Sequence, residues 1–206
     1  DVAGWPTHKI IASGVTYAPQ DNAFFSELSV DENLRLGSLA LSGRRFRAAV
    51  ATLDPQRVGR IAARLAELGA DEIMLADTVG YAQPRQVRSL FKAVRQQIGS
   101  LPLGGHFHDT RGLALANVVA ALDEGVTKFD AALGGLGGCP FAPGASGNVA
   151  MEDVVYLLES MGCDTGIDLP ALLALRQQLP HWLPGVDLHG AIARAGLPKG
   201  FERQAA

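Results

Sequence analysis

The chain has 206 residues, of which 48% are hydrophobic and 19% charged, and this composition excludes an intrinsically disordered protein. Its net charge is only -3 and its Lys and Arg residues are dispersed, so no basic surface for nucleic acid is expected. No apolar run approaches the roughly 18 residues of a membrane-spanning helix, and the first residues lack the pattern of a secretion signal. The sequence therefore predicts a cytoplasmic protein that binds neither nucleic acid nor membrane.

The first part of the chain contains only weak patterns. Residues 10–17 and 46–52 are predicted strands, and residues 30–42 are a predicted helix. From Asp54 the pattern is clearer, because an N-cap residue is followed by Pro55 at the first helical position and Gly69 is placed to end the helix. The apolar face of this helix consists of Val58, Ile61, Ala62, Leu65 and Leu68.

The remainder of the chain alternates short apolar strands with amphipathic helices. Such alternation, with little polar patterning inside the strands, is typical of parallel βαβ units. The predicted elements are strand 73–77, helix 87–98, strand 101–108, helix 113–124, strand 126–133 and helix 151–161.

The fold class is therefore α/β, either an open doubly wound sheet or a closed (β/α)8 (TIM) barrel. Polar residues occur at the ends of several strands, which favours the barrel. A complete barrel has roughly 250 residues, so we expect a partial barrel of about the last five βα units. Residues 1–206 would form this single domain.

The sequence Gly-His-Phe-His-Asp at residues 105–109 is the strongest local pattern. Side chains alternate along a strand, so His106 and His108 should project to one face and Phe107 to the other. Two imidazoles at the carboxyl end of a strand suit a divalent metal. Two hydrogen-bonded histidines without a metal would explain the same spacing.

Residues 134–148 form a glycine-rich segment, GGLGGCPFAPGASGN. Glycine permits positive φ angles and close approach to a ligand, so we expect this segment to contact substrate. Cys139 within it is a candidate acid or base, with an ordinary buried thiol as the alternative. Asn148 is either the N-cap of the next helix or an amide-oxygen ligand for a metal.

Three carboxylates lie at strand ends or at a helix start. Asp77 and Asp109 each precede a threonine at the end of a predicted strand. Asp77 is a candidate site residue, whereas Asp109 either supports the site or caps the next helix. Glu152 lies in the first turn of a helix, where interaction with the helix dipole explains it.

Residues 133–154, LGGLGGCPFAPGASGNVAMEDV, resemble the signature of hydroxymethylglutaryl-CoA lyases. The segments LADTVG at 75–80 and GHFHDTRGLALAN at 105–117 resemble two further elements of that family, with Ala76 where glycine is usual. The C-terminal LPGVDLHGAIARAGLP also follows the family's ending. The resemblance extends from about Asp54 to Pro198.

The resemblance implies a TIM barrel that uses a divalent metal, Mg or Mn, to cleave an acyl-CoA substrate, 3-hydroxy-3-methylglutaryl-CoA, into acetyl-CoA and acetoacetate. It implies His106, His108 and Asn148 as metal ligands and Cys139 and Asp77 as catalytic residues. The residues expected to contact substrate or to support the site are Gly137, Gly138, Pro140, Asp109 and Glu152.

Two features depart from the family. An Arg-Asp-Gly-Leu-Gln element that ends the family's first strand is absent, and FRAAVATLDPQ lacks the longer loop usual at the fifth strand. We therefore expect a truncated barrel, or one completed by another chain. A condensing enzyme like isopropylmalate or homocitrate synthase and a non-catalytic scaffold would also fit, although the GASGN block favours the lyase. An open barrel edge predicts a homo-oligomer.

Overall fold

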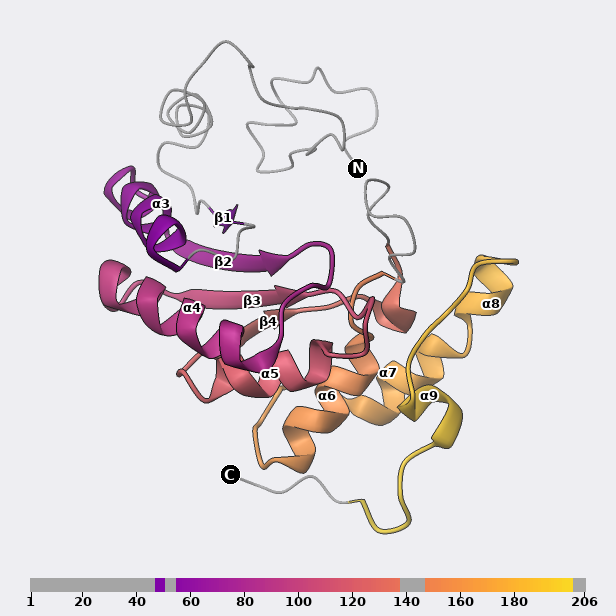
Figure 1. Ribbon diagram of the computed structural model, residues 1–206. Coiled ribbons are helices and arrows are strands. Elements are labelled where there is room, and N and C mark those ends of the chain that lie inside the picture. Colours follow the sequence, from indigo (N-terminus) through magenta and orange to yellow (C-terminus); the bar gives the residue numbers. More distant parts are fainter. Residues whose placement is uncertain (1–46, 51–54, 138–146, 202–206) are drawn as a thin grey trace.

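The computed structural model describes residues 47–50, 55–137 and 147–201 (Figure 1). In these residues four parallel strands form one sheet in the order β1-β2-β3-β4. The strands are β1 (Arg47–Val50), β2 (Glu72–Asp77), β3 (Leu103–Phe107) and β4 (Lys128–Asp130).

Each pair of neighbouring strands is joined by a helix: α3 (Pro55–Glu67), α4 (Pro84–Ile98) and α5 (Ala114–Leu122). These helices lie on one side of the sheet, and α4 packs between α3 and α5 (Figure 1). A doubly wound sheet reverses its strand order at a switch point, whereas strands of a barrel follow one another in sequence order. The observed order is therefore that of an arc of a barrel.

Helix α3 begins as the sequence predicts, and α4 begins three residues before the predicted residue 87. Helix α3 starts at Pro55, and Gly69, with φ of +91°, follows its end. Helix α4 starts with a capping box, in which the Gln83 side chain accepts a hydrogen bond from the Arg85 amide and the Gln86 side chain accepts one from the Gln83 amide. The predicted N-cap Asp54 lies outside the described residues.

The core lies between the sheet and its helices. Helical residues at the predicted apolar spacing and alternate strand residues meet there, and their burial provides the main stabilisation of this layer. Phe91 of α4 and Phe107 of β3 are in contact, with ring centroids 6.3 Å apart. The fully or almost fully buried members include Val58, Ala62, Leu65, Ile73, Leu75, Val87, Phe91, Val94 and Phe107.

Because Phe107 faces the helices, its neighbours His106 and His108 face the opposite side of the sheet. Met74 lies on this face of the sheet, opposite the helices, and its side chain covers Gly104. A Cβ on Gly104 would lie 2.6 Å from Met74 Cε. The predicted orientation of the two histidines is confirmed.

The predicted strand at 126–133 is wrong at its C-terminal end. Strand β4 ends at Asp130, and Leu133–Gly135 form a 3-10 turn, η1. Ala132 is still extended, but its amide donates to the Val149 carbonyl and its carbonyl accepts from the Met151 amide, so the chain pairs with this segment instead of β3. Strand β1 falls within the predicted strand 46–52, whereas the predicted strand 10–17 and helix 30–42 lie outside the described residues.

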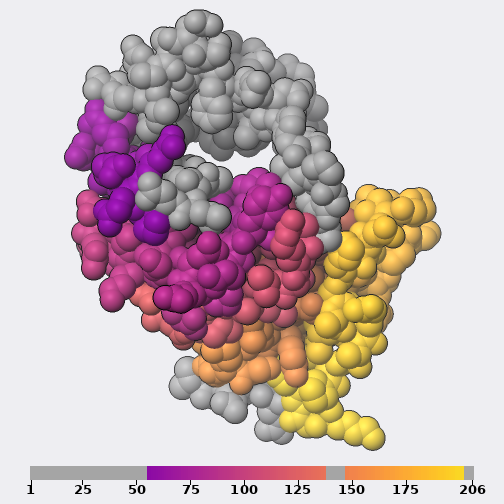
Figure 2. Space-filling view, in the orientation of Figure 1, coloured from indigo at the N-terminus to yellow at the C-terminus, as the bar shows by residue number. Residues whose placement is uncertain are grey.

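The C-terminal part begins with α6 (Met151–Ser160), which confirms the last predicted helix. Helices α7 (Leu169–Arg176), α8 (Leu179–Trp182) and α9 (Ile192–Ala195) follow and form a layer at one side of the molecule (Figure 2, yellow). None of the helices in the described ranges is both long and apolar enough to cross a lipid bilayer.

Candidate metal centre and active site

Polar side chains from three neighbouring strands meet at the carboxyl edge of the sheet. Ala76 of β2 is in register with His106 of β3, which is in register with Asp130 of β4. Asp77 is the last residue of β2, and His108 directly follows β3. This edge is where parallel α/β proteins place their ligands.

The side chain of His106 is held by a carboxylate. His106 Nδ1 lies 2.5 Å from Asp130 Oδ1, and the pair is partly buried. A proton on Nδ1 shared with this carboxylate leaves Nε2 with a free lone pair, which is how carboxylates orient metal-bound histidines. Asp130 was not among the residues predicted from the sequence, although an aspartate inside an otherwise apolar strand end was a signal for it.

His108 is buried, at 7% exposed, and its Nδ1 has no hydrogen-bond partner among the described residues. Burial lowers the pKa of His108 and the neighbouring His106 lowers it further, while Asp77 raises it. The two imidazole rings are 5.2 Å apart between centroids and tilted by 55°. A neutral buried imidazole with an unused nitrogen is suited to bind a metal.

Asn148 lies next to His108 because the chain after the glycine-rich segment returns to β3. The Asp109 amide donates to the Gly147 carbonyl at 3.0 Å, and the Val149 amide donates to the Phe107 carbonyl at 3.0 Å. Asn148 Nδ2 donates to the Leu136 carbonyl at 2.6 Å, and Oδ1 is buried without a partner among the described residues.

The interpretation of Asn148 as a helix N-cap is wrong. Ala150 occupies the N-cap position of α6, and no side chain of the described residues caps that helix end. Asn148 lies two residues earlier and is anchored to the backbone of the glycine-rich segment instead. Its side chain is therefore fixed through its nitrogen, with its oxygen available to a ligand.

These residues fit part of a divalent metal site. Two imidazoles and one amide oxygen are suitable ligands, and two of their polar atoms are buried without partners in the described ranges, which is costly unless a ligand satisfies them. Within residues 47–50, 55–137 and 147–201, no three His, Cys, Asp or Glu side chains come together as a metal-binding group. The described residues thus provide an incomplete set of ligands.

Asp77 and Asp109 both bind backbone amides. Asp77 accepts hydrogen bonds from the amides of Tyr81 and Ala82, at 2.9 and 3.0 Å, and so shapes the turn after β2. Asp109 accepts one from the Ala114 amide at 2.9 Å, where α5 begins. The helix-capping interpretation of Asp109 agrees with this contact, and Asp77 retains acceptor capacity on both oxygens.

Glu152 is not explained by the helix dipole alone. It lies in the first turn of α6 as predicted, but it is fully buried. Its Oε1 binds Arg176 Nε at 2.9 Å and its Oε2 accepts a hydrogen bond from the Gly134 amide at 3.0 Å. Arg176 was not predicted from the sequence, because no local pattern marks it as a partner of Glu152.

The predicted catalytic Cys139, together with Gly138 and Pro140, lies outside the described residues. Gly137 is described: its φ is +89° and its carbonyl accepts a hydrogen bond from the Asn148 amide at 3.0 Å. Gly137 and Asn148 of the glycine-rich segment are therefore joined, and Asn148 lies beside His108.

The sequence pattern of the HMGL-like family matches residues 44–179, well over half of the chain. The chain belongs to the HMGL-like family. It is 52% identical over 130 residues to hydroxymethylglutaryl-CoA lyase of Pseudomonas mevalonii, covering 63% of this chain and 42% of that protein. It is 46% identical over 144 residues to (R)-citramalyl-CoA lyase of Chloroflexus aurantiacus, covering 70% of this chain and 45% of that protein.

Among solved structures, HMG-CoA lyase from Acinetobacter baumannii in complex with coenzyme A and 3-methylmalate is 40% identical, with a TM-score of 0.73. That match covers 95% of this chain and 64% of the other. These similarities confirm the predicted family and the partial barrel. The chain spans less than half the length of the two curated relatives above. The family match ends before residues 183–198, whose resemblance stays a prediction.

Proposed function

We propose that this chain cleaves 3-hydroxy-3-methylglutaryl-CoA to acetyl-CoA and acetoacetate, with Mg or Mn as cofactor. One observation carries the proposal: within the described residues, His108 Nδ1 and Asn148 Oδ1 are buried without partners on paired backbone positions at the ligand-binding edge of the sheet. The relative from Pseudomonas mevalonii is named for the lyase reaction and supports the choice of substrate.

The residues proposed to hold the metal are His106, His108 and Asn148. When bound, the metal would polarise the tertiary hydroxyl of the substrate and stabilise the negative charge that develops on its oxygen. Asp130 holds the proton of His106 on Nδ1 and keeps the other ring nitrogen available. The backbone pairing of residues 107–109 with 147–149 places Asn148 directly beside His108.

Cleavage of the carbon–carbon bond requires a base for the hydroxyl proton and an acid for the acetyl-CoA enolate. Asp77 is our candidate base, because its charge acts on His108 and its oxygens can each accept a further hydrogen bond. Cys139 is our candidate acid. Gly137, Gly138 and Pro140 are proposed to contact the acyl-CoA.

Asp109 and Glu152 are proposed to support the site without contacting substrate. Asp109 binds the first amide of α5 and so fixes the backbone directly after His108. Glu152 binds the Gly134 amide and so fixes the start of the glycine-rich segment.

A second candidate substrate is (R)-citramalyl-CoA. The relative named for that lyase is 46% identical and covers 70% of this chain, more than the match to the Pseudomonas mevalonii enzyme covers. Two further candidate functions are condensation of acetyl-CoA with a 2-oxo acid and a non-catalytic scaffold. The unpartnered histidine and asparagine atoms count against the scaffold.

For the whole chain, we propose one partial-barrel domain over residues 1–206 that forms a homo-oligomer in the cytoplasm. Its partner would be an acyl-CoA, with no nucleic acid and no membrane. Dispersed Lys and Arg residues and a net charge of -3 support the absence of nucleic acid.

The test is release of acetyl-CoA from 3-hydroxy-3-methylglutaryl-CoA by the purified chain with Mn or Mg, beside a Cys139→Ala variant. A parallel assay supplies (R)-citramalyl-CoA and identifies the second product. Metal-dependent turnover that the variant loses would establish the lyase, and the preferred thioester would settle the substrate. Absence of turnover on both thioesters, with no Mn binding, would contradict the proposal and favour the scaffold.

A further inference from the structure

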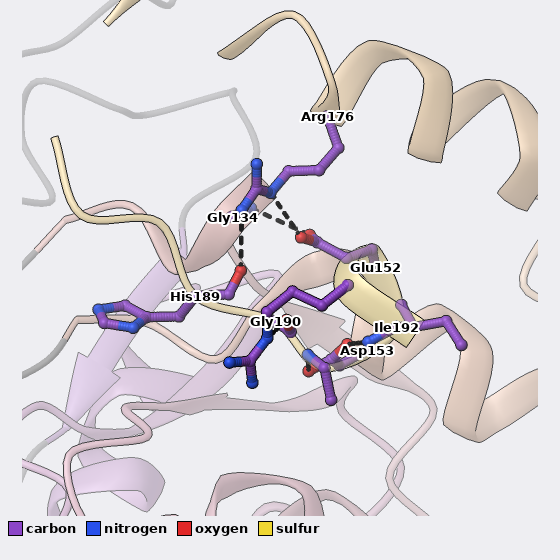
Figure 3. Close-up of polar contacts among 9 residues, drawn as sticks. Gly134, Glu152, Asp153, Arg176, His189, Gly190 and Ile192 are labelled. Carbon is purple, nitrogen blue, oxygen red and sulfur yellow. Dashed lines mark hydrogen bonds and ion pairs between the residues drawn. The ribbon is translucent and has the colours of Figure 1, made fainter. Parts of the chain in front are cut away.

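A buried charged pair, Glu152 and Arg176, connects four parts of the chain, near residues 134, 152, 176 and 189 (Figure 3). Glu152 is fully buried and Arg176 is 9% exposed. Burying an ion pair contributes little net stability compared with apolar packing of the same volume, whereas removing one partner leaves an uncompensated charge. A geometric role therefore accounts for the pair better than stability alone does.

Three hydrogen bonds of this pair, which Figure 3 shows, and one backbone hydrogen bond form a closed ring. The Gly134 amide donates to Glu152 Oε2 at 3.0 Å, and the Gly134 carbonyl accepts from the His189 amide at 2.8 Å. The His189 carbonyl accepts from Arg176 Nη2 at 3.2 Å, and Arg176 Nε donates to Glu152 Oε1 at 2.9 Å. We call Gly134, Glu152, Arg176 and His189 the polar ring.

Two glycines leave the room that the polar ring requires. A Cβ on Gly134 would lie 2.9 Å from Arg176 Nε, and a Cβ on Gly190 would lie 2.8 Å from Glu152 Oε1. Both residues have positive φ, +66° and +112°. Any other residue at either position would strain the backbone and push the ion pair apart.

The polar ring is connected to Asn148 through the turn η1. Gly134 belongs to this turn, and two residues later the Leu136 carbonyl accepts the hydrogen bond from Asn148 Nδ2 at 2.6 Å. The Gly137 carbonyl then binds the Asn148 amide. The backbone that the ring fixes is thus the backbone that orients the Asn148 side chain.

We propose that Arg176 is a positioning residue: by closing the polar ring it fixes residues 134–137 and so holds the Asn148 side chain, through its Nδ2, at the backbone position paired with His108. The role of the Asn148 side-chain oxygen as a metal ligand rests on the proposed function, whereas the positioning does not. A segment near the C-terminus thereby controls the geometry of a site built at the ends of the strands.

The test uses the full-length chain labelled with nitrogen-15 and three variants. Arg176→Ala removes both donors, Arg176→Lys keeps the charge but lacks the forked guanidinium, and Arg88→Ala removes an exposed ion pair with Asp123 as a matched control. The primary readout is the side-chain amide signal of Asn148, assigned with Asn148→Asp. Amide hydrogen exchange of residues 133–137 and 188–192 and Mn affinity are measured on the same samples.

In Arg176→Ala we expect the Asn148 side-chain signals to shift or broaden and exchange in both segments to rise at least about tenfold. Mn affinity should fall about tenfold, as for loss of other residues that orient metal ligands. Arg176→Lys should lie between wild type and Arg176→Ala, and Arg88→Ala should match wild type.

Unchanged Asn148 signals in folded Arg176→Ala would overturn the proposal, as would equal changes in Arg88→Ala. Should Arg176→Ala fail to fold, Gly190→Ala opens the ring from its other side and the same readouts apply. A wild-type chain that binds no Mn would contradict the proposed function, and the Asn148 signals would still decide the positioning role.

Discussion

Two buried polar groups lie near each other in this molecule, and they differ in how well their hydrogen bonds are satisfied. In the polar ring, each of the four residues donates to or accepts from its neighbours on both sides. In the histidine pair with Asn148, two buried atoms have no partner in the described part of the chain. A network in which every polar group has a partner is rigid. Buried polar atoms without partners cost stability and are typical of ligand-binding sites.

The largest effect on the free energy of unfolding should come from breaking the polar ring. Glu152→Ala leaves the Arg176 charge buried without its partner, and we expect the free energy of unfolding to fall by about 3–5 kcal/mol. Urea unfolding followed by circular dichroism measures this. The control is Glu67→Ala, which removes a 65% exposed partner of Arg64 and should cost under about 1 kcal/mol. Similar losses in the two variants would mean that the polar ring does not fix the fold.

A smaller effect on the free energy of unfolding should come from the histidine pair with Asn148, and this effect should depend on metal. Mn at about 100 times its dissociation constant should raise the free energy of unfolding of the wild type by about 2.7 kcal/mol. His108→Ala should abolish this gain, because it removes a proposed ligand, and should change stability without metal much less than Glu152→Ala does. His181→Ala, an exposed histidine in α8, should retain the full gain. Equal Mn stabilisation in His108→Ala would exclude this residue as a ligand.

The smallest effect should come from a residue that orients a ligand. Asp130→Asn weakens the interaction with His106 Nδ1, and we expect Mn affinity to fall about tenfold with little change in unfolding. Calorimetric titration with Mn measures it. Asp123→Asn, at an exposed carboxylate that pairs with Arg88, should leave the affinity unchanged. A loss as complete as that of His108→Ala would make Asp130 a ligand itself.

Local patterns were sufficient to predict most of the described fold. Apolar spacing located α3 and α4, and strand alternation placed His106 and His108 on one face. The end of the strand at 126–133 was missed because Ala132 pairs with Ala150 instead of β3, and the neighbouring sequence does not indicate that partner.

The partners of the site residues were harder to predict than the residues themselves. Asp130 lies 24 positions from His106, and Arg176 lies 24 positions from Glu152. No local periodicity relates residues at that separation, since the contacts depend on how strands and helices pack. For the same reason the sequence allowed Asn148 to be an N-cap, whereas in the structure it is bound to Leu136 and Gly137.

The hydrogen bond between the Asn148 amide and the Gly137 carbonyl joins the two ends of the residues numbered 138–146. Bringing the two ends of a loop together costs chain entropy, and this cost increases only slowly with the length of the loop. The free energy of unfolding should therefore depend only weakly on the number of residues between Gly137 and Asn148.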